Sequence, residues 1–147
     1  MYLIDTNVIS EKRKGPRADS GVLTFWRLIL VNDDFLPVQV LGELRRGVEM
    51  LKHRGDLPQA ALLQSWLEAV QVEYADRILT FDAECAHIWG QITANSYQNL
   101  IDKQIAAMAL LYDLTIVSRN IDHFSGTGVR VLNPFQDDGS PSKVPSL

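Results

Sequence analysis

Three carboxylates interrupt otherwise apolar stretches of the chain: Asp5 in MYLIDTNVIS, Glu43 in VQVLGELRRGVEML and Asp102 in NLIDKQIAAMAL. An ionised carboxylate in apolar surroundings is costly unless it has a partner. Carboxylate oxygens are the ligands that hard cations such as Mg²⁺ and Mn²⁺ prefer. If the three side chains meet, they form a metal site with open water positions, which can activate a water and neutralise charge on a phosphodiester.

Helix stabilisation is the competing explanation for each acid taken alone. A carboxylate near a helix start interacts favourably with the helix dipole, which accounts for Glu43 and Asp102. Asp5 follows a short apolar segment and precedes Thr6 and Asn7, two residues suited to cap a first helix. For one acid the two explanations are about equally good, but the three acids together favour a site.

Other catalytic chemistries lack the residues they need. His53, His87 and His123 are scattered without HxxxH or HExxH spacing, so we expect no zinc site and a structural role for His87. The chain has no GxxxxGK[ST] loop, no GxGxxG after a strand and no GxSxG elbow. Cys85 is the single cysteine and is expected in the core, and GTG at 126–128 is expected to form a turn.

Short apolar segments alternate with longer amphipathic ones. The predicted strands cover residues 2–5, 35–40, 78–81, 114–120 and 129–134. A helix is predicted to start after Asp5, and further helices cover 21–30, 40–51, 59–70, 82–93 and 99–113. This alternation predicts an α/β domain of three layers, α/β/α, with a mostly parallel central sheet. In such sheets ligands bind at the carboxyl ends of the strands, where Asp5 and the segment 118–120 are expected to lie.

The bulk composition fits one globular domain. The chain has 147 residues, 46% of them hydrophobic and 22% charged. It has no apolar run of membrane-spanning length and no signal peptide, and with a single cysteine we expect a cytoplasmic protein. A net charge of −4 does not point to nucleic-acid binding by charge alone, but bound cations would change the local charge. The polar residues 136–147 are expected to form a flexible tail.

Several segments together resemble a known family. LIDTNVIS, LGELRRGVEML, IDKQIAAMAL, TIVSRNIDHF and GVRVLNPF, in this order, are similar to the motifs of PIN-domain ribonucleases, and among these to the VapC and FitB toxins of bacterial type II toxin–antitoxin pairs. The resemblance covers residues 1–135, which are expected to form one PIN-like nuclease domain. It implies a Mg²⁺- or Mn²⁺-dependent endoribonuclease that acts on RNA. It also implies inhibition by a cognate antitoxin, a toxin homodimer, and a larger assembly on DNA through the antitoxin.

The resemblance assigns roles to particular residues. Asp5, Glu43 and Asp102 correspond to metal ligands, and Asn120 occupies a fourth position where family members have Asp or Asn. Asp122 is a further candidate, because alternation along an extended segment would direct 120 and 122 to one side. Polar neighbours are expected to orient the carboxylates and waters. These neighbours are Thr6, Asn7 and Ser118.

Basic residues near the proposed ligands are candidates for contacts with RNA phosphates. They are Lys12, Arg13, Lys14 and Arg17 after the first strand, Arg45 and Arg46 beside Glu43, and Arg119 beside Asn120. A solvated charged face explains residues 12–17 equally well. Arg45 and Arg46 could instead pair with acids of an antitoxin.

An apolar stripe on the segment 59–70 has two interpretations. Leu62, Leu63, Trp66 and Leu67 are expected to face the core, which is the more common situation for such a stripe. The alternative is that this stripe lines an apolar groove for an antitoxin segment.

Two other functions remain open at this level. The chain could be a weakly active or inactive PIN-domain subunit of a DNA-bound antitoxin–toxin regulatory complex, because Asn120 supplies no fourth carboxylate. A phosphatase-like or purely structural α/β domain would explain the fold. It would not explain why an acid lies at each of these apolar edges.

Overall fold

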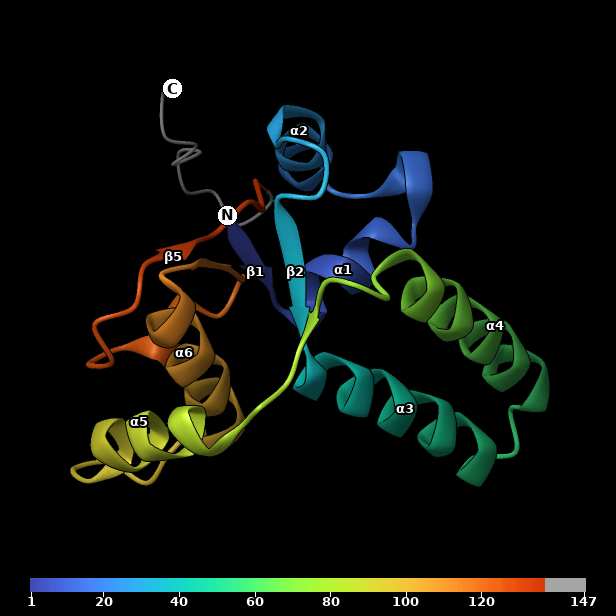
Figure 1. Ribbon diagram of the computed structural model, residues 1–147. Coiled ribbons are helices and arrows are strands. Elements are labelled where there is room, and N and C mark those ends of the chain that lie inside the picture. Colours follow the sequence, from blue (N-terminus) through green and yellow to red (C-terminus); the bar gives the residue numbers. More distant parts are fainter. Residues whose placement is uncertain (137–147) are drawn as a thin grey trace.

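The structure, a computed structural model, describes residues 1–136, and their strands form one parallel sheet (Figure 1). The strands are β1 (Tyr2–Ile4), β2 (Asp34–Pro37), β3 (Ile78–Leu79), β4 (Thr115–Val117) and β5 (Val131–Leu132). Their order is β3-β2-β1-β4-β5, and each pairing is parallel. The predicted tail lies outside the described residues except for Gln136.

Helices cover both faces of the sheet. They are α1 (Thr6–Lys12), α2 (Ser20–Leu28), α3 (Val38–His53), α4 (Leu57–Glu73), α5 (Ala83–Thr93) and α6 (Leu100–Tyr112), with short 3₁₀ turns η1 (Gly15–Arg17) and η2 (Ile121–Phe124). Helices α1 to α4 pack on one face, and α5 and α6 pack on the other. The predicted three-layer α/β/α fold is confirmed.

The alternation of side chains along β1 creates two apolar cores. Ile4 packs with residues of α1 to α4, whereas Leu3 packs with residues of α5 and α6, and both side chains are fully buried. Successive residues of a strand point to opposite faces, so the central strand contributes to each core. Burial of a side chain of this size stabilises the fold by about 1.5–3 kcal/mol. Cys85 is buried in the second core, as expected.

The first helix is capped by Asp5 and not by Thr6 or Asn7, which were the favoured candidates among the three. Asp5 has extended backbone angles and accepts a hydrogen bond from the Thr6 N–H at 2.8 Å. A cap residue must lie outside the helix, and Thr6 is already its first residue. The expectation that 120 and 122 share one side of an extended segment is also wrong, because η2 begins at residue 121.

Residues 134–136, at the end of the described chain, pack against the amino-terminal end of α2. Asp19 Oδ1 accepts hydrogen bonds from the N–H groups of Gly21 and Val22 and also from Gln136. A Cβ atom at Gly21 would lie 2.0 Å from the carbonyl oxygen of Pro134. Only glycine allows this approach.

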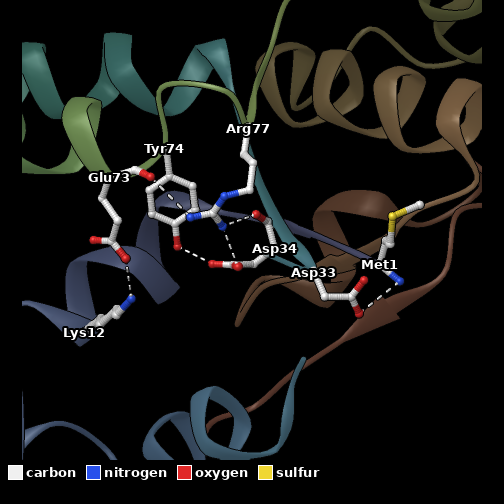
Figure 2. Close-up of polar contacts among 7 residues, drawn as sticks. All are labelled: Met1, Lys12, Asp33, Asp34, Glu73, Tyr74 and Arg77. Carbon is white, nitrogen blue, oxygen red and sulfur yellow. Dashed lines mark hydrogen bonds and ion pairs between the residues drawn. The ribbon is translucent and has the colours of Figure 1, made fainter. Parts of the chain in front are cut away.

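A buried polar cluster joins α4 to the start of β2 (Figure 2). Asp34 accepts hydrogen bonds from the Tyr74 hydroxyl and, at 2.7 Å, from the guanidinium of Arg77. Arg77 also donates to the Asp34 carbonyl oxygen at 2.7 Å. Burial, followed by the hydrogen bond to Asp34, raises the pKa of Tyr74, so its hydroxyl stays a donor. Within residues 1–136 no helix is long and apolar enough to cross a membrane.

Candidate active site

Asp5 lies at the carboxyl end of β1 and is only 3% exposed. Its Oδ1 accepts from the Thr6 N–H, and its Oδ2 accepts from the Ser118 hydroxyl at 2.7 Å and from the Asn7 amide at 3.4 Å. Burial raises the pKa of Asp5, and the charge of Asp102 adds to this increase. The hydrogen bonds from Ser118 and Thr6 oppose it, because they favour the ionised form.

Glu43 approaches Asp5 from the second turn of α3. The residue is exposed as a whole, yet partial burial of its carboxyl group raises its pKa. The charges of Asp5 and Asp102 raise the pKa further, whereas the Thr6 side chain and Arg46 lower it. The charge of Asp102 acts on both Asp5 and Glu43, and the charge of Asp5 acts on Glu43, so the three predicted acids lie within electrostatic range around the carboxyl end of β1.

Asp102 lies in the first turn of α6, where it contacts a residue that the sequence reasoning left out. His123 Nδ1 is 2.8 Å from Asp102 Oδ2. A positive charge on His123 lowers the pKa of Asp5. His123 reaches this position because η2 is helical, and three residues per turn return it to the side of Asn120. An extended segment favours Asp122 as the residue beside Asn120. A helical turn over the same residues would instead have indicated His123.

The polar neighbours of Asp5 connect the ends of β1 and β4. Ser118 is fully buried, and its hydroxyl oxygen accepts from the Asn7 amide at 3.2 Å and from the Asn120 N–H at 3.0 Å. Asn7 Oδ1 in turn accepts from the Arg119 N–H at 3.0 Å. Asn7 and Ser118 therefore occupy the places expected of groups that orient a carboxylate.

The side chains of Asn120 and Asp122 are exposed. Among the described residues the structure records no hydrogen bond to either of these side chains, although the backbone N–H of Asn120 is bonded to Ser118. A fourth ligand position at Asn120 or Asp122 stays a prediction.

The basic candidates fall into two groups. Lys12, Arg13 and Lys14 lie at the far end of α1 from Asp5, where Lys12 forms an ion pair with Glu73 at 3.2 Å (Figure 2). Arg46 lies close enough to Glu43 to lower its pKa.

Most of the basic candidates also have a partner within the described chain. Lys12 lies over the ring of Trp26 at 4.3 Å, Arg13 over that of Trp66 at 5.8 Å and Arg119 over that of Phe135 at 3.7 Å, while Lys14 pairs with Glu11 at 2.7 Å and Arg45 bonds to Gln64. Arg17 belongs to η1 and is exposed. These contacts leave RNA binding a prediction.

The stripe on α4 is divided between core and surface. Leu67 and Val70 are buried, Leu63 and Trp66 pack against the first core, and Leu62 is 58% exposed. The expectation that Leu62 faces inward is wrong, because it lies nearly opposite Leu67 around the helix.

The donor groups fit a divalent cation in chemistry. Asp5 and Glu43, whose pKa values are raised in part by neighbouring negative charge, would gain from a cation beside them. The Thr6 hydroxyl oxygen beside Glu43 is buried and has no hydrogen-bond partner of normal geometry in the described part of the chain. The three acids nevertheless do not form a finished ligand set, since within residues 1–136 no three His, Cys, Asp or Glu side chains are grouped closely enough to hold a metal.

Comparison with known proteins identifies the class. The family model of the PIN domain matches residues 2–128, so the chain belongs to the PIN domain family. It is similar to "Toxin FitB" of Neisseria gonorrhoeae, with 33% identity over 93% of this chain and 100% of that protein. It is also similar to "VapC ribonuclease Y4jK" of Sinorhizobium fredii, with 26% identity over 92% of this chain and 99% of that protein.

Solved structures agree with this assignment. The crystal structure of FitAcB from Neisseria gonorrhoeae matches with a TM-score of 0.79 and 32% identity, covering 91% of this chain and 98% of that chain. A structure of FitAB bound to a DNA fragment matches with the same TM-score of 0.79 and 30% identity, covering 92% and 96% of the two chains.

Proposed function

We propose that this protein is the toxin of a type II toxin–antitoxin pair and a metal-dependent endoribonuclease of the cytoplasm. The observation that carries the proposal is that Asp5, Glu43 and Asp102, which come from three separate elements, lie within electrostatic range of one another near the carboxyl end of β1. The similarity to a FitB toxin and to a VapC ribonuclease supports RNA as the substrate.

The three acids would hold Mg²⁺ or Mn²⁺. When bound, the ion would supply an activated water and neutralise charge on the scissile phosphodiester. Ser118 and Asn7 keep the Asp5 carboxylate in one orientation through their hydrogen bonds.

Two further residues support these acids in the proposed reaction. His123 restrains the Asp102 carboxylate through the contact between its Nδ1 and Asp102 Oδ2. Arg46 places a positive charge near Glu43, where it would attract an RNA phosphate.

Cleavage of RNA by single-site variants tests the proposal. We expect Asp5→Asn and Asp102→Asn to lower the rate of metal-dependent cleavage by at least about 100-fold, because each removes a charged ligand. The control is Asp76→Asn, which changes an exposed acid in the turn after α4. EDTA should abolish cleavage by the wild-type protein. Cleavage at the wild-type rate by both site variants would contradict the assignment of the site.

The proposed partners are an antitoxin and a second copy of the toxin. A groove of about 370 Å³ between α3 and α4, lined by Val38, Leu41, Gly42, Arg45, Leu67 and Gln71, is suited to an antitoxin segment. Co-expression with the product of a neighbouring small reading frame should yield a stable complex without cleavage activity. Light scattering of the separated toxin should give the mass of a dimer.

A regulatory subunit with little nuclease activity is the second candidate. It is favoured by the exposed Asn120 in the fourth position and by the similarity to a FitAB complex bound to DNA. The same cleavage assay separates the two candidates. A wild-type protein that binds its antitoxin but cuts no RNA at saturating Mg²⁺ or Mn²⁺ would favour the regulatory subunit.

A further inference from the structure

Glu43 and Asp102 reach the site from helices that pack on opposite faces of the sheet. Helix α3 belongs to the layer of the first core, and α6 belongs to the layer of the second (Figure 1). The sheet separates these layers along most of their length, so the two helices can approach each other only around its edge. A contact between α3 and α6 at that edge therefore helps to set the distance between the two carboxylates.

A hydrogen bond between two glutamine side chains makes this connection. Gln39 Nε2 on α3 donates to Gln104 Oε1 on α6 at 3.2 Å. Gln39 lies four residues before Glu43, so the two side chains share one face of α3. Gln104 lies two residues after Asp102 in the first turns of α6, on a different face of the helix, so it acts on the Asp102 carboxylate only through the helix backbone. Within residues 1–136 the structure records no other side-chain hydrogen bond or ion pair between α3 and α6.

The side-chain amide oxygen of Gln39 gives a second, independent observation. Gln39 Oε1 is buried and has no hydrogen-bond partner in the described part of the chain. A buried unsatisfied acceptor destabilises the fold, and an apolar side chain of the same shape would avoid this penalty. An amide at this position is therefore not explained by stability alone.

We propose that Gln39 and Gln104 are positioning residues, whose hydrogen bond sets the separation of Glu43 and Asp102. We call this pair the amide clasp. The inference rests on the proposed function, because the separation matters only if the two carboxylates bind one cation. Neither glutamine contacts RNA or the metal in this account. They act through the helices that carry the acids.

Loss of the clasp should therefore weaken metal binding. A displacement of about 1 Å is enough to impair a site of this kind. We expect Gln39→Met and Gln104→Met each to raise the Mn²⁺ dissociation constant by about 10-fold or more. The KM for RNA should stay unchanged at saturating metal, since the basic residues are untouched.

The variants are designed to keep the fold. Methionine has a similar length and flexibility and a good helix propensity, so it removes the amide with little change in volume. The double variant Gln39→Met/Gln104→Met should bind Mn²⁺ no more weakly than either single variant, because one hydrogen bond is lost in all three. The control is Gln91→Met on α5, which removes an exposed amide outside the site.

Three measurements on the full chain decide between the outcomes. Paramagnetic resonance gives Mn²⁺ binding without RNA, the cleavage assay gives the metal concentration for the half-maximal rate, and thermal unfolding checks the fold. Weaker Mn²⁺ binding in folded single variants, with no further loss in the double variant, supports the clasp. Wild-type binding and half-maximal metal concentration in all three variants would overturn it. If the wild-type protein itself neither binds Mn²⁺ nor cuts RNA, the proposed function fails, and the clasp fails with it.

Discussion

Asp5 combines two roles that the sequence presents as alternatives. One carboxylate oxygen caps α1, and the other accepts hydrogen bonds from Ser118 and Asn7. The two roles are compatible because the start of α1 and the carboxyl end of β4 meet at the same point of the sheet. A capping residue need not be excluded from a site when each of its oxygens has its own set of partners.

Glu43 should destabilise the metal-free protein at neutral pH. The pKa of Glu43 is raised in the folded state, so the folded protein holds the proton more tightly than the unfolded chain. The free energy of unfolding therefore falls as the pH rises through this pKa. We expect Glu43→Gln to unfold at higher urea concentration than wild type at about pH 8 in EDTA. The difference should vanish as the pH is lowered toward the ordinary Glu pKa of about 4.3.

Glu49→Gln on the same helix is the matched control. Glu49 is half-buried and forms ion pairs with Lys52 at 3.3 Å and with Arg45 at 3.8 Å, so its removal should give no gain in stability. An equal gain in both variants would show that the net negative charge of the chain, and not the site, is responsible.

The sequence predicts the three acids but not His123. An acid that interrupts an apolar pattern is visible in the sequence, because burial of a charge needs a reason. The contact of His123 with Asp102 depends on the turn η2, and a polar segment between two strands carries no comparable periodic signal. Asp122 is a candidate only if this segment is extended, whereas Asn120 is assigned by the family resemblance.

The identity of the elements is easier to predict than their ends. The segment 21–30 was expected to be helical throughout, whereas α2 ends at Leu28 and leaves Leu30 75% and Val31 91% exposed. Apolar periodicity records which residues share a face, but it contains no information on where the hydrogen-bonded ladder stops. Helix α3 likewise begins at Val38, directly after Pro37, two residues before its first predicted residue.

Helix α2 depends on the glycine at its amino-terminal end. We expect Gly21→Ala to lower the free energy of unfolding by about 1–3 kcal/mol or more, because the new methyl group would overlap the Pro134 carbonyl and displace the chain at Gln136. Urea unfolding measures this change.

Gly90→Ala in α5 is the control for the intrinsic helix propensity. A Cβ atom at Gly90 would meet no atom within 4 Å, so this variant should gain about 0.5–1 kcal/mol. A gain of similar size in Gly21→Ala would mean that the carboxyl-terminal segment does not hold its place against α2 in solution.

The whole molecule consists of two cores that share one sheet, so both should unfold together. Trp26 and Trp66 pack against the first core, whereas Trp89 donates to the Leu100 carbonyl in the layer of α5 and α6. Coincident transitions are expected for a small domain in which no layer is stable alone. The variant Trp26→Phe/Trp66→Phe retains only Trp89, and Trp66→Phe/Trp89→Phe retains only Trp26. In each variant we predict that the urea midpoint of tryptophan fluorescence equals the midpoint of the circular dichroism transition. A fluorescence midpoint that departs from that transition would show that one layer unfolds first.

The order of the strands could not be derived from the sequence. The fold class follows from the alternation of strands and helices, but the adjacency of β1 and β4 was only a condition for bringing Asp5 close to residues 118–120. The structure fulfils it through the pairs Leu3 with Ile116 and Ile4 with Val117. Such long-range pairing is decided by the packing of both layers at once, and no local pattern encodes it.

The same pairing fixes when the site can form during synthesis. Asp5 leaves the ribosome 113 residues before Ser118 does. Until β4 arrives, β1 has β2 alone as a neighbour, and Asp5 lacks the hydroxyl that holds its second oxygen. A prematurely terminated chain that ends before β4 would therefore carry all three acids without the framework that brings them together. For a protein proposed to attack RNA, an unfinished copy would thus be harmless to the message from which it is being translated.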